Sequence, residues 1–144
     1  MSVPLSFTDA VFEAMSGITT TGSTVMIGLD HAPAGILLWR ALLQWMGGIG
    51  IIVTAIAILP MLQVGGMQLF RTESSSRTEK ALPRAAPLAG WIASIYASLT
   101  AIWALMLWMA GMGPFDAIAH AMTTIATGGF STSDQSIGAF QSPA

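Results

Sequence analysis

The sequence predicts an all-α membrane protein that combines two transmembrane helices with two re-entrant loops. First, charged residues make up only 8% of the chain and hydrophobic residues 53%, whereas typical soluble domains carry about 25% charged residues. Second, residues 41–70 and 85–115 contain no charged residue, and each stretch exceeds the roughly 20 helical residues that cross a bilayer. Third, a short helical motif followed by a threonine- and glycine-rich tract occurs twice.

The composition also excludes several classes of function. The chain has no cysteine, so neither disulfide bonds nor thiolate metal sites are possible. A net charge of −2 gives no reason to expect a nucleic-acid partner. His31 and His120 have no partners at metal-ligand spacing, and a grouping of His120 with Thr123 and Thr124 is a weak case for catalysis. We therefore expect neither an enzyme nor a cofactor.

The basic residues predict the orientation in the membrane. Four of the five lie in residues 71–84, the linker between the two charge-free stretches. Because cytoplasmic loops are enriched in lysine and arginine, this linker is expected in the cytoplasm, and the segments flanking the spans are expected outside. Those outer segments contain five acids and one base, and their negative charge would concentrate cations at an entrance. Helix capping and loop solvation are the alternative roles for these acids, which are Asp9, Glu13, Asp30, Asp116 and Asp134.

An internal repeat relates the two ends of the chain at an offset of 107 residues. The segment DAVFEAM at residues 9–15 aligns with DAIAHAM at residues 116–122, in which His120 stands where the first copy has a glutamate. A polar tract follows each segment. We call TTTGST at residues 19–24 the first tract and ATGGFS at residues 126–131 the second tract.

Each copy of the repeat begins with the start signals of a helix. Ser6 and Asp9 fit a capping box, and Pro114 with the acid that follows it belongs in a first helical turn. The nine residues from Asp9 to Gly17 would rise only about 13 Å. This is less than half of the bilayer core, so the motif predicts a re-entrant half-helix and not a span.

The tract after each short helix is expected to leave the helical conformation, because β-branched threonine and glycine are unfavourable in a helix. Non-helical backbone within a membrane persists only where protein or water satisfies its polar groups. An extended segment that climbs back out can offer its carbonyls to a dehydrated cation. Gly22, Gly128 and Gly129 would supply the positive φ angles that turn carbonyls inward, and the helix C-terminus adds partial negative charge. The tracts therefore predict a cation-conducting pore, and a duplicated polar surface loop is the alternative.

The first span should begin near Ile36 and carries a glycine cluster. The sequence GGIG at residues 47–50 lacks the preceding strand and the lysine of a phosphate-binding loop. It predicts close helix packing, with a pore helix as the candidate neighbour. The charge-free stretch is longer than the bilayer is thick, which predicts tilt or a break near Pro60 and Gly65-Gly66.

The second span should run from about Pro87 to Gly111, with Trp91 and Trp108 near its ends as interfacial anchors. At the outer end of the first span lies Arg40. We expect its side chain to snorkel to the lipid headgroups. Pairing with an acid of the loop region is the alternative.

Two other classes of function fit parts of the pattern. A secondary transporter holds an anionic substrate with half-helices. It would aim helix N-termini at its site, whereas here each short helix precedes its tract. A purely structural two-span module would predict that replacing Gly22 or Gly129 changes stability without changing any ion preference.

Four stretches of the sequence resemble the TrkH family, the membrane subunits of the Trk potassium-uptake system in the Trk/Ktr/HKT superfamily. They are TDAVFEAMSGITTTGSTV, WRALLQWMGGIGIIV, AILPMLQVGGMQLF and FDAIAHAMTTIATGGF, at residues 8–25, 39–53, 57–70 and 115–130. The family fold has four repeats of helix, pore loop and helix around one pore. The resemblance implies that residues 1–70 are the pore loop and second helix of one repeat, residues 71–84 a cytoplasmic linker, and residues 85–144 the first helix and pore loop of the next.

The resemblance also assigns candidate site residues. The family's filter glycine falls on Gly22 and Gly129. Compared with the TVGYG filter of potassium channels, the chain keeps only a T-x-G core, so a transporter that discriminates poorly between sodium and potassium is the alternative. Potassium would bind at Thr20, Thr21, Gly22, Thr127, Gly128 and Gly129, through the carbonyls of Thr20, Thr21, Thr127 and Gly128, flanked by Thr19, Ser23, Ala126 and Phe130.

The protein implied by this resemblance is a multi-pass component of the inner cell membrane that takes up potassium. Its partners would be the lipid bilayer, the remaining repeats of the same pore, a second copy in a homodimer and a cytosolic nucleotide-binding regulatory subunit. A pore built from four loops cannot close with two, so we expect these residues to be an incomplete fragment. The transported potassium ion is the only ligand expected.

Overall fold

The structure, a computed structural model, describes residues 5–62 and 82–140, with side chains described for residues 5–55 and 90–140. Within these ranges the chain is helical and contains no strand, in agreement with the predicted all-α class. The elements in order are α1 (Phe7–Ile18), η1 (Leu29–His31), α2 (Ala34–Leu62), α3 (Leu82–Met109), α4 (Pro114–Ile125) and η4 (Ser136–Ala139), where η marks a short 3-10 helix.

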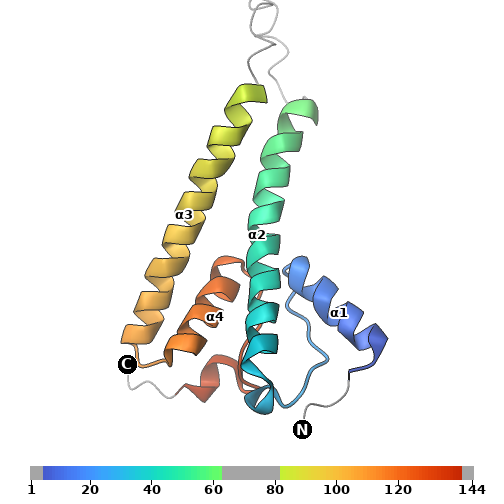
Figure 1. Cartoon of the computed structure of the whole chain (residues 1–144), viewed down its shortest axis with the longest axis vertical. Helices are drawn as coiled ribbons and strands as arrows, with labels where there is room; N and C mark the ends of the chain where they lie inside the picture. The colour runs from blue at the N-terminus through green and yellow to red at the C-terminus, as the bar shows by residue number, and fades with distance from the viewer. Residues whose placement is uncertain (1–4, 63–81, 141–144) are drawn as a thin grey trace, which may run out of the picture.

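Two long helices form the frame of the molecule and two short ones lie against it (Figure 1). Helices α2 and α3 run the length of the structure and spread apart at one end. Helix α4 lies between them there and contacts both, while α1 packs on the other side of α2. The short helices reach only to about the middle of α2, as re-entrant half-helices would.

The two long helices have the length and composition of membrane spans. The segments Ala34–Ala55 of α2 and Gly90–Met109 of α3 are 22 and 20 residues long and strongly apolar. Their positions confirm the two predicted spans. The predicted break at Pro60 is wrong, because α2 continues through this residue to Leu62. Proline removes one backbone hydrogen bond, and an otherwise apolar membrane helix tolerates that loss near its end.

Two further sequence predictions fall partly outside the described residues. Gly65 and Gly66, the other expected break, are not described. Most of the predicted linker, residues 71–81, is not described either, and its last three residues belong to α3. The proposed division at residues 70 and 84 therefore stays a prediction.

Polar contacts tie α2 to α3 within their apolar surroundings. The indole Nε1 of Trp45 donates a hydrogen bond to Thr100 Oγ1 over 3.0 Å. The hydroxyl of Tyr96 donates to the backbone carbonyl of Trp45 over 3.2 Å, and the two aromatic rings lie 5.4 Å apart between centroids. Since an apolar environment offers no competing water, these bonds set the register of the two helices.

The short helices begin where the sequence predicted. The Ser6 hydroxyl oxygen accepts a hydrogen bond from the Asp9 backbone N–H, and the Asp9 carboxylate accepts one from the Ser6 backbone N–H, which together make the predicted capping box. Pro114 occupies the first turn of α4, with Asp116 in the same turn. Both helices are 12 residues long, or about 18 Å, which is too short to span a bilayer.

The glycine cluster of α2 receives the C-terminal ends of both short helices. A Cβ on Gly47 would overlap the carbonyl oxygen of Ile18 at the end of α1. A Cβ on Gly48 would lie 3.1 Å from the Cα of Ala126, directly after α4. Gly50 has open space around it. The prediction that this cluster permits close helix packing is thus confirmed at two of its three glycines, while the identity of the neighbours as pore helices stays a prediction.

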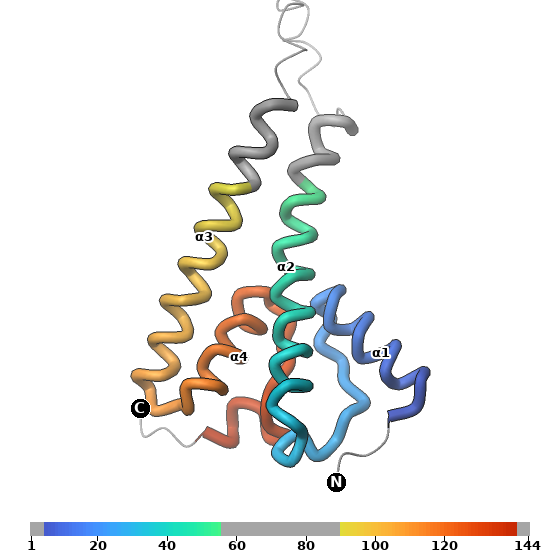
Figure 2. The backbone as a smooth tube through the Cα atoms, in the orientation of Figure 1, coloured from blue at the N-terminus to red at the C-terminus, as the bar shows by residue number. Residues whose placement is uncertain are grey.

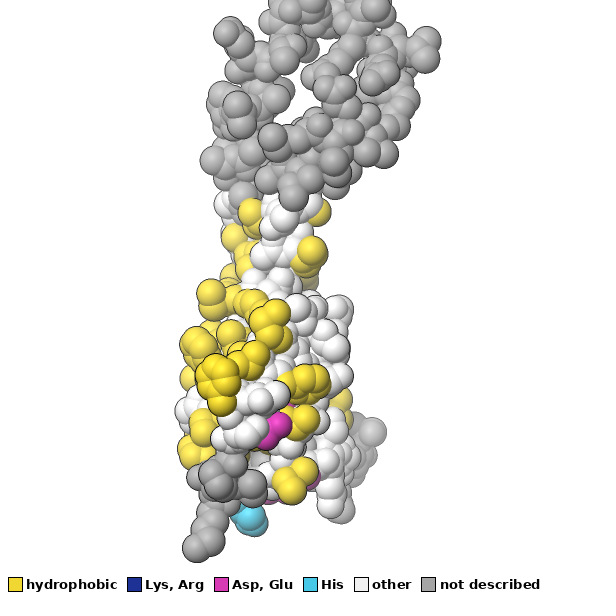
Figure 3. Space-filling model, turned by 90° about the vertical axis from the view of Figure 1, so that its right-hand side faces the viewer, with side chains coloured by type: hydrophobic (Ala, Val, Ile, Leu, Met, Phe, Trp, Pro, Cys, Tyr) yellow, Lys and Arg dark blue, Asp and Glu magenta, His cyan; other side chains and the backbone are white. Residues whose placement is uncertain are grey.

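Exposed hydrophobic side chains are spread among other residues on the side of the molecule that carries α1 (Figure 3), and further ones lie on α3. On α1 they recur every three or four residues and so form a single stripe, with Phe7 86% and Met15 56% exposed beside Val11 and Ile18. On α3, Trp91 is exposed near one end. Such surfaces suit lipid or the apolar flank of another helix.

Candidate functional site: the paired tracts

The first and second tracts leave the C-terminal ends of α1 and α4 and run back toward the end of the molecule from which those helices start (Figure 2). Neither tract continues its helix, as predicted. The tracts are direct neighbours, because a Cβ on Gly22 would overlap the carbonyl oxygen of Gly128. The fold therefore brings together two segments that are more than one hundred residues apart in sequence.

Both tracts adopt the same unusual backbone conformation. Thr20 and Thr127 each have a φ of 55°, and Gly22 and Gly129 have φ angles of 79° and 83°. The residue between each pair is not in the positive-φ region. The pattern of positive φ is thus the same at equivalent positions of the two tracts. Extended, non-helical segments of this kind can line an ion path with their backbone carbonyls.

Two details of this conformation differ from the prediction. Gly128 was expected to take a positive φ, and it does not. Thr20 and Thr127 take it instead, although a side chain in this region costs about 1–3 kcal/mol. Backbone strain repeated at equivalent positions of two repeats indicates a conformation that the surrounding fold imposes.

The same hydrogen bonds anchor each tract to the last turn of its own helix. In the first copy, the backbone N–H of Thr21 donates to the Ser16 carbonyl over 3.0 Å. In the second, the N–H of Gly128 donates to the Thr123 carbonyl over 2.9 Å, at the position 107 residues further on. The repeat seen in the sequence is therefore also a repeat of backbone geometry.

The carbonyls at the centre of the tracts are left without protein donors. Among the described residues, no hydrogen bond uses the carbonyl oxygen of Thr20, Thr21, Thr127 or Gly128. Thr21 and Thr127 are exposed and Thr20 is half-buried, so these carbonyls are not all enclosed by the protein. Neighbouring carbonyls without protein donors are suited to replace the hydration shell of a cation.

The flanking residues, in contrast, are fastened to the protein. The Thr19 hydroxyl donates to the Met15 carbonyl over 2.7 Å and lies 2.8 Å from the Thr21 hydroxyl. The carbonyl of Ser23 accepts a hydrogen bond from the Ser16 hydroxyl over 2.6 Å. These contacts fix both ends of the first tract while the carbonyls between them stay open.

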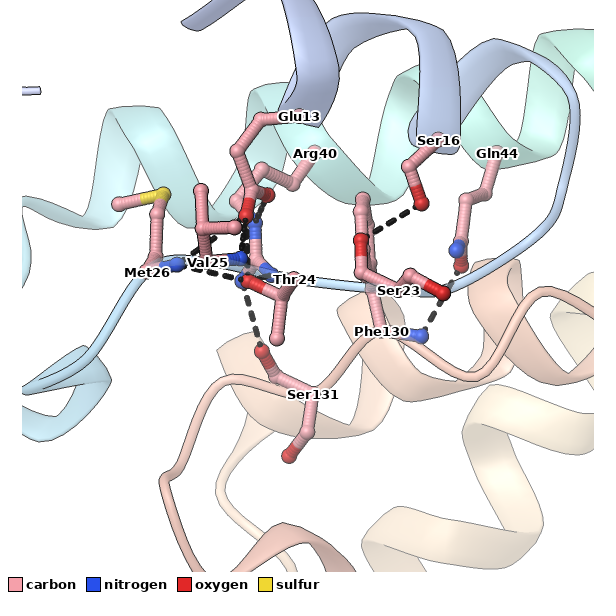
Figure 4. A network of polar contacts seen from close by, with 10 residues as sticks. All are labelled: Glu13, Ser16, Ser23, Thr24, Val25, Met26, Arg40, Gln44, Phe130 and Ser131. Carbon is pink, nitrogen blue, oxygen red and sulfur yellow. Dashed lines mark hydrogen bonds and ion pairs between the residues drawn. The ribbon is translucent and has the colours of Figure 1, made fainter. Parts of the chain in front are cut away.

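Behind the first tract lies a buried carboxylate (Figure 4). Glu13 is 6% exposed. Its Oε1 accepts hydrogen bonds from the Thr24 hydroxyl and from the backbone N–H groups of Val25 and Met26, the latter two over 2.6 and 3.1 Å. Glu13, a residue of α1, thereby holds residues 24–26, which are the end of the first tract and the two residues after it.

The partner of Glu13 is Arg40, which also reaches the second tract (Figure 4). The Arg40 Nε lies 3.2 Å from Glu13 Oε2. One terminal nitrogen donates to the Thr24 hydroxyl over 3.0 Å and the other to the Ser131 carbonyl over 3.2 Å. The guanidinium carbon also lies 4.1 Å from the centre of the Phe130 ring, close enough for a cation–π contact.

These contacts correct the sequence analysis. Arg40 is 3% exposed, so the expectation that it snorkels to the headgroups is wrong, and the alternative of pairing with an acid is confirmed. Its five donor groups in a planar fork allow one side chain to join both tracts. The sequence alone left both roles open, because an arginine at the end of an apolar span can either snorkel or face the protein interior.

His120 does for the second tract what Glu13 does for the first. Its Nε2 lies 3.0 Å from the Ser131 hydroxyl, and Ser131 stands at the repeat position of Thr24. Its Nδ1 lies 2.8 Å from the Asp116 carbonyl. The predicted structural role of His120 is confirmed, and the repeat keeps the contact while changing the side chain.

Gln44 is a further residue of the site, and sequence reasoning missed it. It is fully buried in the middle of α2. Its Oε1 accepts a hydrogen bond from the Phe130 backbone N–H over 3.1 Å, and its amide presses against Gly128. The available signal was a polar side chain four residues after Arg40, on the same face of an apolar helix.

A hollow of about 450 Å³ lies between the ends of the two tracts. Gly22 and Gly129 line it, together with Arg40 and the outer residues Ser133 and Asp134. The Asp134 carboxylate accepts the Leu29 backbone N–H over 3.0 Å, which joins the two outer loops beside the hollow. Within the described ranges no three or more His, Cys, Asp or Glu side chains are grouped as a metal site would require.

Comparisons with known proteins agree over nearly the whole chain. A sequence model of the TrkH family, described as "Cation transport protein", matches residues 1–144. The Trk system potassium uptake protein TrkH of Escherichia coli K12 is 56% identical over 141 residues, which cover 96% of this chain and 29% of that protein. The Trk system potassium uptake protein TrkI of Halomonas elongata is 53% identical over 136 residues, which cover 94% and 28%.

A solved structure gives the same match. The crystal structure of the potassium transporter TrkH from Vibrio parahaemolyticus superposes with a TM-score of 0.80 at 51% sequence identity, covering 96% of this chain and 26% of that chain. The chain thus spans less than a third of the length of these relatives.

Proposed function

The chain belongs to the TrkH family of cation transport proteins, and from this premise we propose that it supplies two of the loops of a potassium pore. The complete protein takes up potassium across the cell membrane. Backbone carbonyls of the first and second tracts replace the water around the ion as it passes. The ion contacts are the carbonyls of Thr20, Thr21, Thr127 and Gly128, held in place by Gly22 and Gly129.

The observation that carries this proposal is the set of four carbonyls without protein donors, on backbone whose conformation is repeated in both copies. An all-oxygen site without a carboxylate binds a monovalent cation weakly enough to release it. The relatives TrkH and TrkI are named as potassium uptake proteins.

The direction of the short helices favours a cation over an anion. Helices α1 and α4 end at the tracts, so their C-terminal partial negative charges point toward the proposed ion path. A secondary transporter for an anionic substrate would need the opposite direction. The acids Asp30 and Asp134 in the outer loops add to the attraction for cations.

The remaining parts of the pore lie beyond these residues in the proposed architecture. Two loops enclose half of a pore, and the other loops come from further repeats of the complete protein. The family resemblance supports a homodimer and a cytosolic nucleotide-binding regulatory subunit as partners. Residues 71–84 are the cytoplasmic linker between the spans.

The proposed topology makes a direct prediction. In a complete protein without other cysteines, Ser75→Cys should react with a membrane-impermeant maleimide only after the cells are opened, because the basic linker is cytoplasmic. His31→Cys, in the exposed loop between α1 and α2, is the matched control and should react in intact cells. Labelling of Ser75→Cys in intact cells would refute the topology.

The proposed activity is tested by uptake of radioactive rubidium in bacteria that lack their own potassium-uptake systems. Cells that make the complete protein should grow at low potassium and take up rubidium, and excess potassium should compete far better than excess sodium. Equal competition by the two ions would favour a transporter of low selectivity. Absence of any rubidium uptake by correctly inserted protein would overturn the proposal.

A further inference from the structure

Gln44 stands out because a large polar side chain is completely enclosed in the middle of a membrane helix. It is the largest fully buried side chain among the described residues. It lies one helical turn beyond Arg40, on the same face of α2. Polar side chains at this depth are costly unless they bind a protein group, a ligand or water.

The amide of Gln44 contacts the second tract through its oxygen and its carbon. Oε1 accepts the Phe130 backbone N–H over 3.1 Å. A Cβ on Gly128 would overlap Cδ, Oε1 and Nε2 of Gln44. Gly128 does not have a positive φ. The requirement for glycine at this position therefore comes from the lack of space for a side chain.

The amide nitrogen of Gln44 lies near both tracts, closer to Gly128 than to Gly22. Because the Phe130 N–H is a donor, the oxygen must point to it, and the orientation of the amide is settled. Nε2 then lies 3.7 Å from the position that a Cβ on Gly22 would take. Among the described residues Nε2 has no hydrogen-bond acceptor, so it directs a buried N–H donor at the junction of the two tracts, where main-chain carbonyls lie.

We infer that Gln44 is a positioning residue of the filter, which sets the spacing between the two tracts and thereby the preference for potassium over sodium. This inference rests on the proposed potassium pore. The amide lies against Gly128 and near Gly22, beside the point where the Gly128 carbonyl meets the first tract, so its length sets how the two tracts sit on α2. The distance between the tracts decides how closely their carbonyls surround an ion, and the smaller sodium ion requires closer oxygens than potassium does.

A shorter side chain at position 44 should compensate for a larger one at position 128. Gly128→Ala adds a methyl group where the Gln44 amide lies, and Gln44→Asn withdraws that amide by one methylene. We therefore expect the double variant Gln44→Asn with Gly128→Ala to recover selectivity that Gly128→Ala loses. Gly129→Ala is the matched control. Its defect comes from a φ of 83° in open space, so Gln44→Asn should not rescue it.

The experiment compares these variants in the complete protein. Rubidium uptake is measured with potassium or sodium as competitor, and inserted protein is quantified by size-exclusion chromatography in detergent. Gln44→Leu, which removes the amide, should lower the potassium-to-sodium competition ratio by about tenfold. Gln44→Glu keeps an acceptor for the Phe130 N–H and should lose less. Gly50→Ala, in open space on α2, should match the unmodified protein.

The possible outcomes separate this inference from the proposed function. An unchanged competition ratio in Gln44→Leu, or equal rescue of Gly128→Ala and Gly129→Ala by Gln44→Asn, would overturn the inference. If every Gln44 variant fails to insert and the double variant shows no rescue, Gln44 serves folding alone and the inference is also wrong. If the unmodified protein takes up no rubidium, the proposed function itself has failed, and the inference fails with it.

Discussion

Replacing Gly22 by serine in the complete protein is expected to reduce the preference for potassium over sodium by about tenfold or more, while the protein still inserts. A side chain in the left-handed region costs about 1–2 kcal/mol, and Gly22 has a φ of 79°. Its Cβ would also overlap the carbonyl oxygen of Gly128. The backbone can relieve this strain and this overlap only by rotating or displacing carbonyls of the tract. The measurement is rubidium uptake in competition with potassium and with sodium.

Gly129→Ser should also reduce the preference for potassium over sodium, but by less. Gly129 has a φ of 83°, while the space around it is open. Gly28→Ser is the matched control for backbone strain. It has a φ of 75°, also in open space, and lies outside both tracts. It should lower stability without changing the competition ratio. Equal loss of selectivity in Gly28→Ser, or unchanged selectivity in both tract variants, would contradict the filter assignment.

Removal of the charge at Arg40 is expected to have the largest effect on stability. Arg40→Gln leaves the Glu13 carboxylate buried without its ion-pair partner, which typically costs about 3–5 kcal/mol. It also removes the contacts to Thr24 and to the Ser131 carbonyl, so the outer ends of the two tracts lose their link. We expect a marked loss of folded protein, measured as the yield and the thermal midpoint in detergent.

The double variant Glu13→Gln with Arg40→Gln should be more stable than Arg40→Gln alone, because no uncompensated charge remains. The second repeat supports this expectation, since His120 holds Ser131 there without a carboxylate. Trp39→Leu, at an exposed neighbouring position, is the control for a change at this end of α2. If Arg40→Gln were as stable as Trp39→Leu, the ion pair between Arg40 and Glu13 would contribute nothing to the stability of the folded protein.

The two repeats solve the same problem with different chemistry. In each, a side chain of the short helix holds the last residue of the tract, through Glu13 and Thr24 in the first copy and His120 and Ser131 in the second. Only the first copy has a buried carboxylate, that of Glu13, and the guanidinium of Arg40 neutralises it. Because Arg40 also bonds to Ser131, the charge of one repeat fastens the tract of the other.

Much of the fold could be predicted from local sequence signals. The spans follow from the charge-free stretches, and the short helices from the capping box at Ser6 and from Pro114. The strained glycines at 22 and 129 follow from the repeat. Local signals suffice for these features because hydropathy, capping and φ preference depend on near neighbours along the chain.

The sequence by itself determined two apolar spans, two half-helices and two tracts that leave the helical conformation at equivalent positions. Only the tertiary structure decided that Arg40 is buried and that Gln44 lies against Gly128 and near Gly22, and it assigned the space requirement to Gly128. The reason is physical. These contacts join residues 27, 86 and 91 positions apart, and whether a polar side chain meets lipid or a buried partner depends on which helices pack around it, a property that hydropathy and spacing along one segment do not contain.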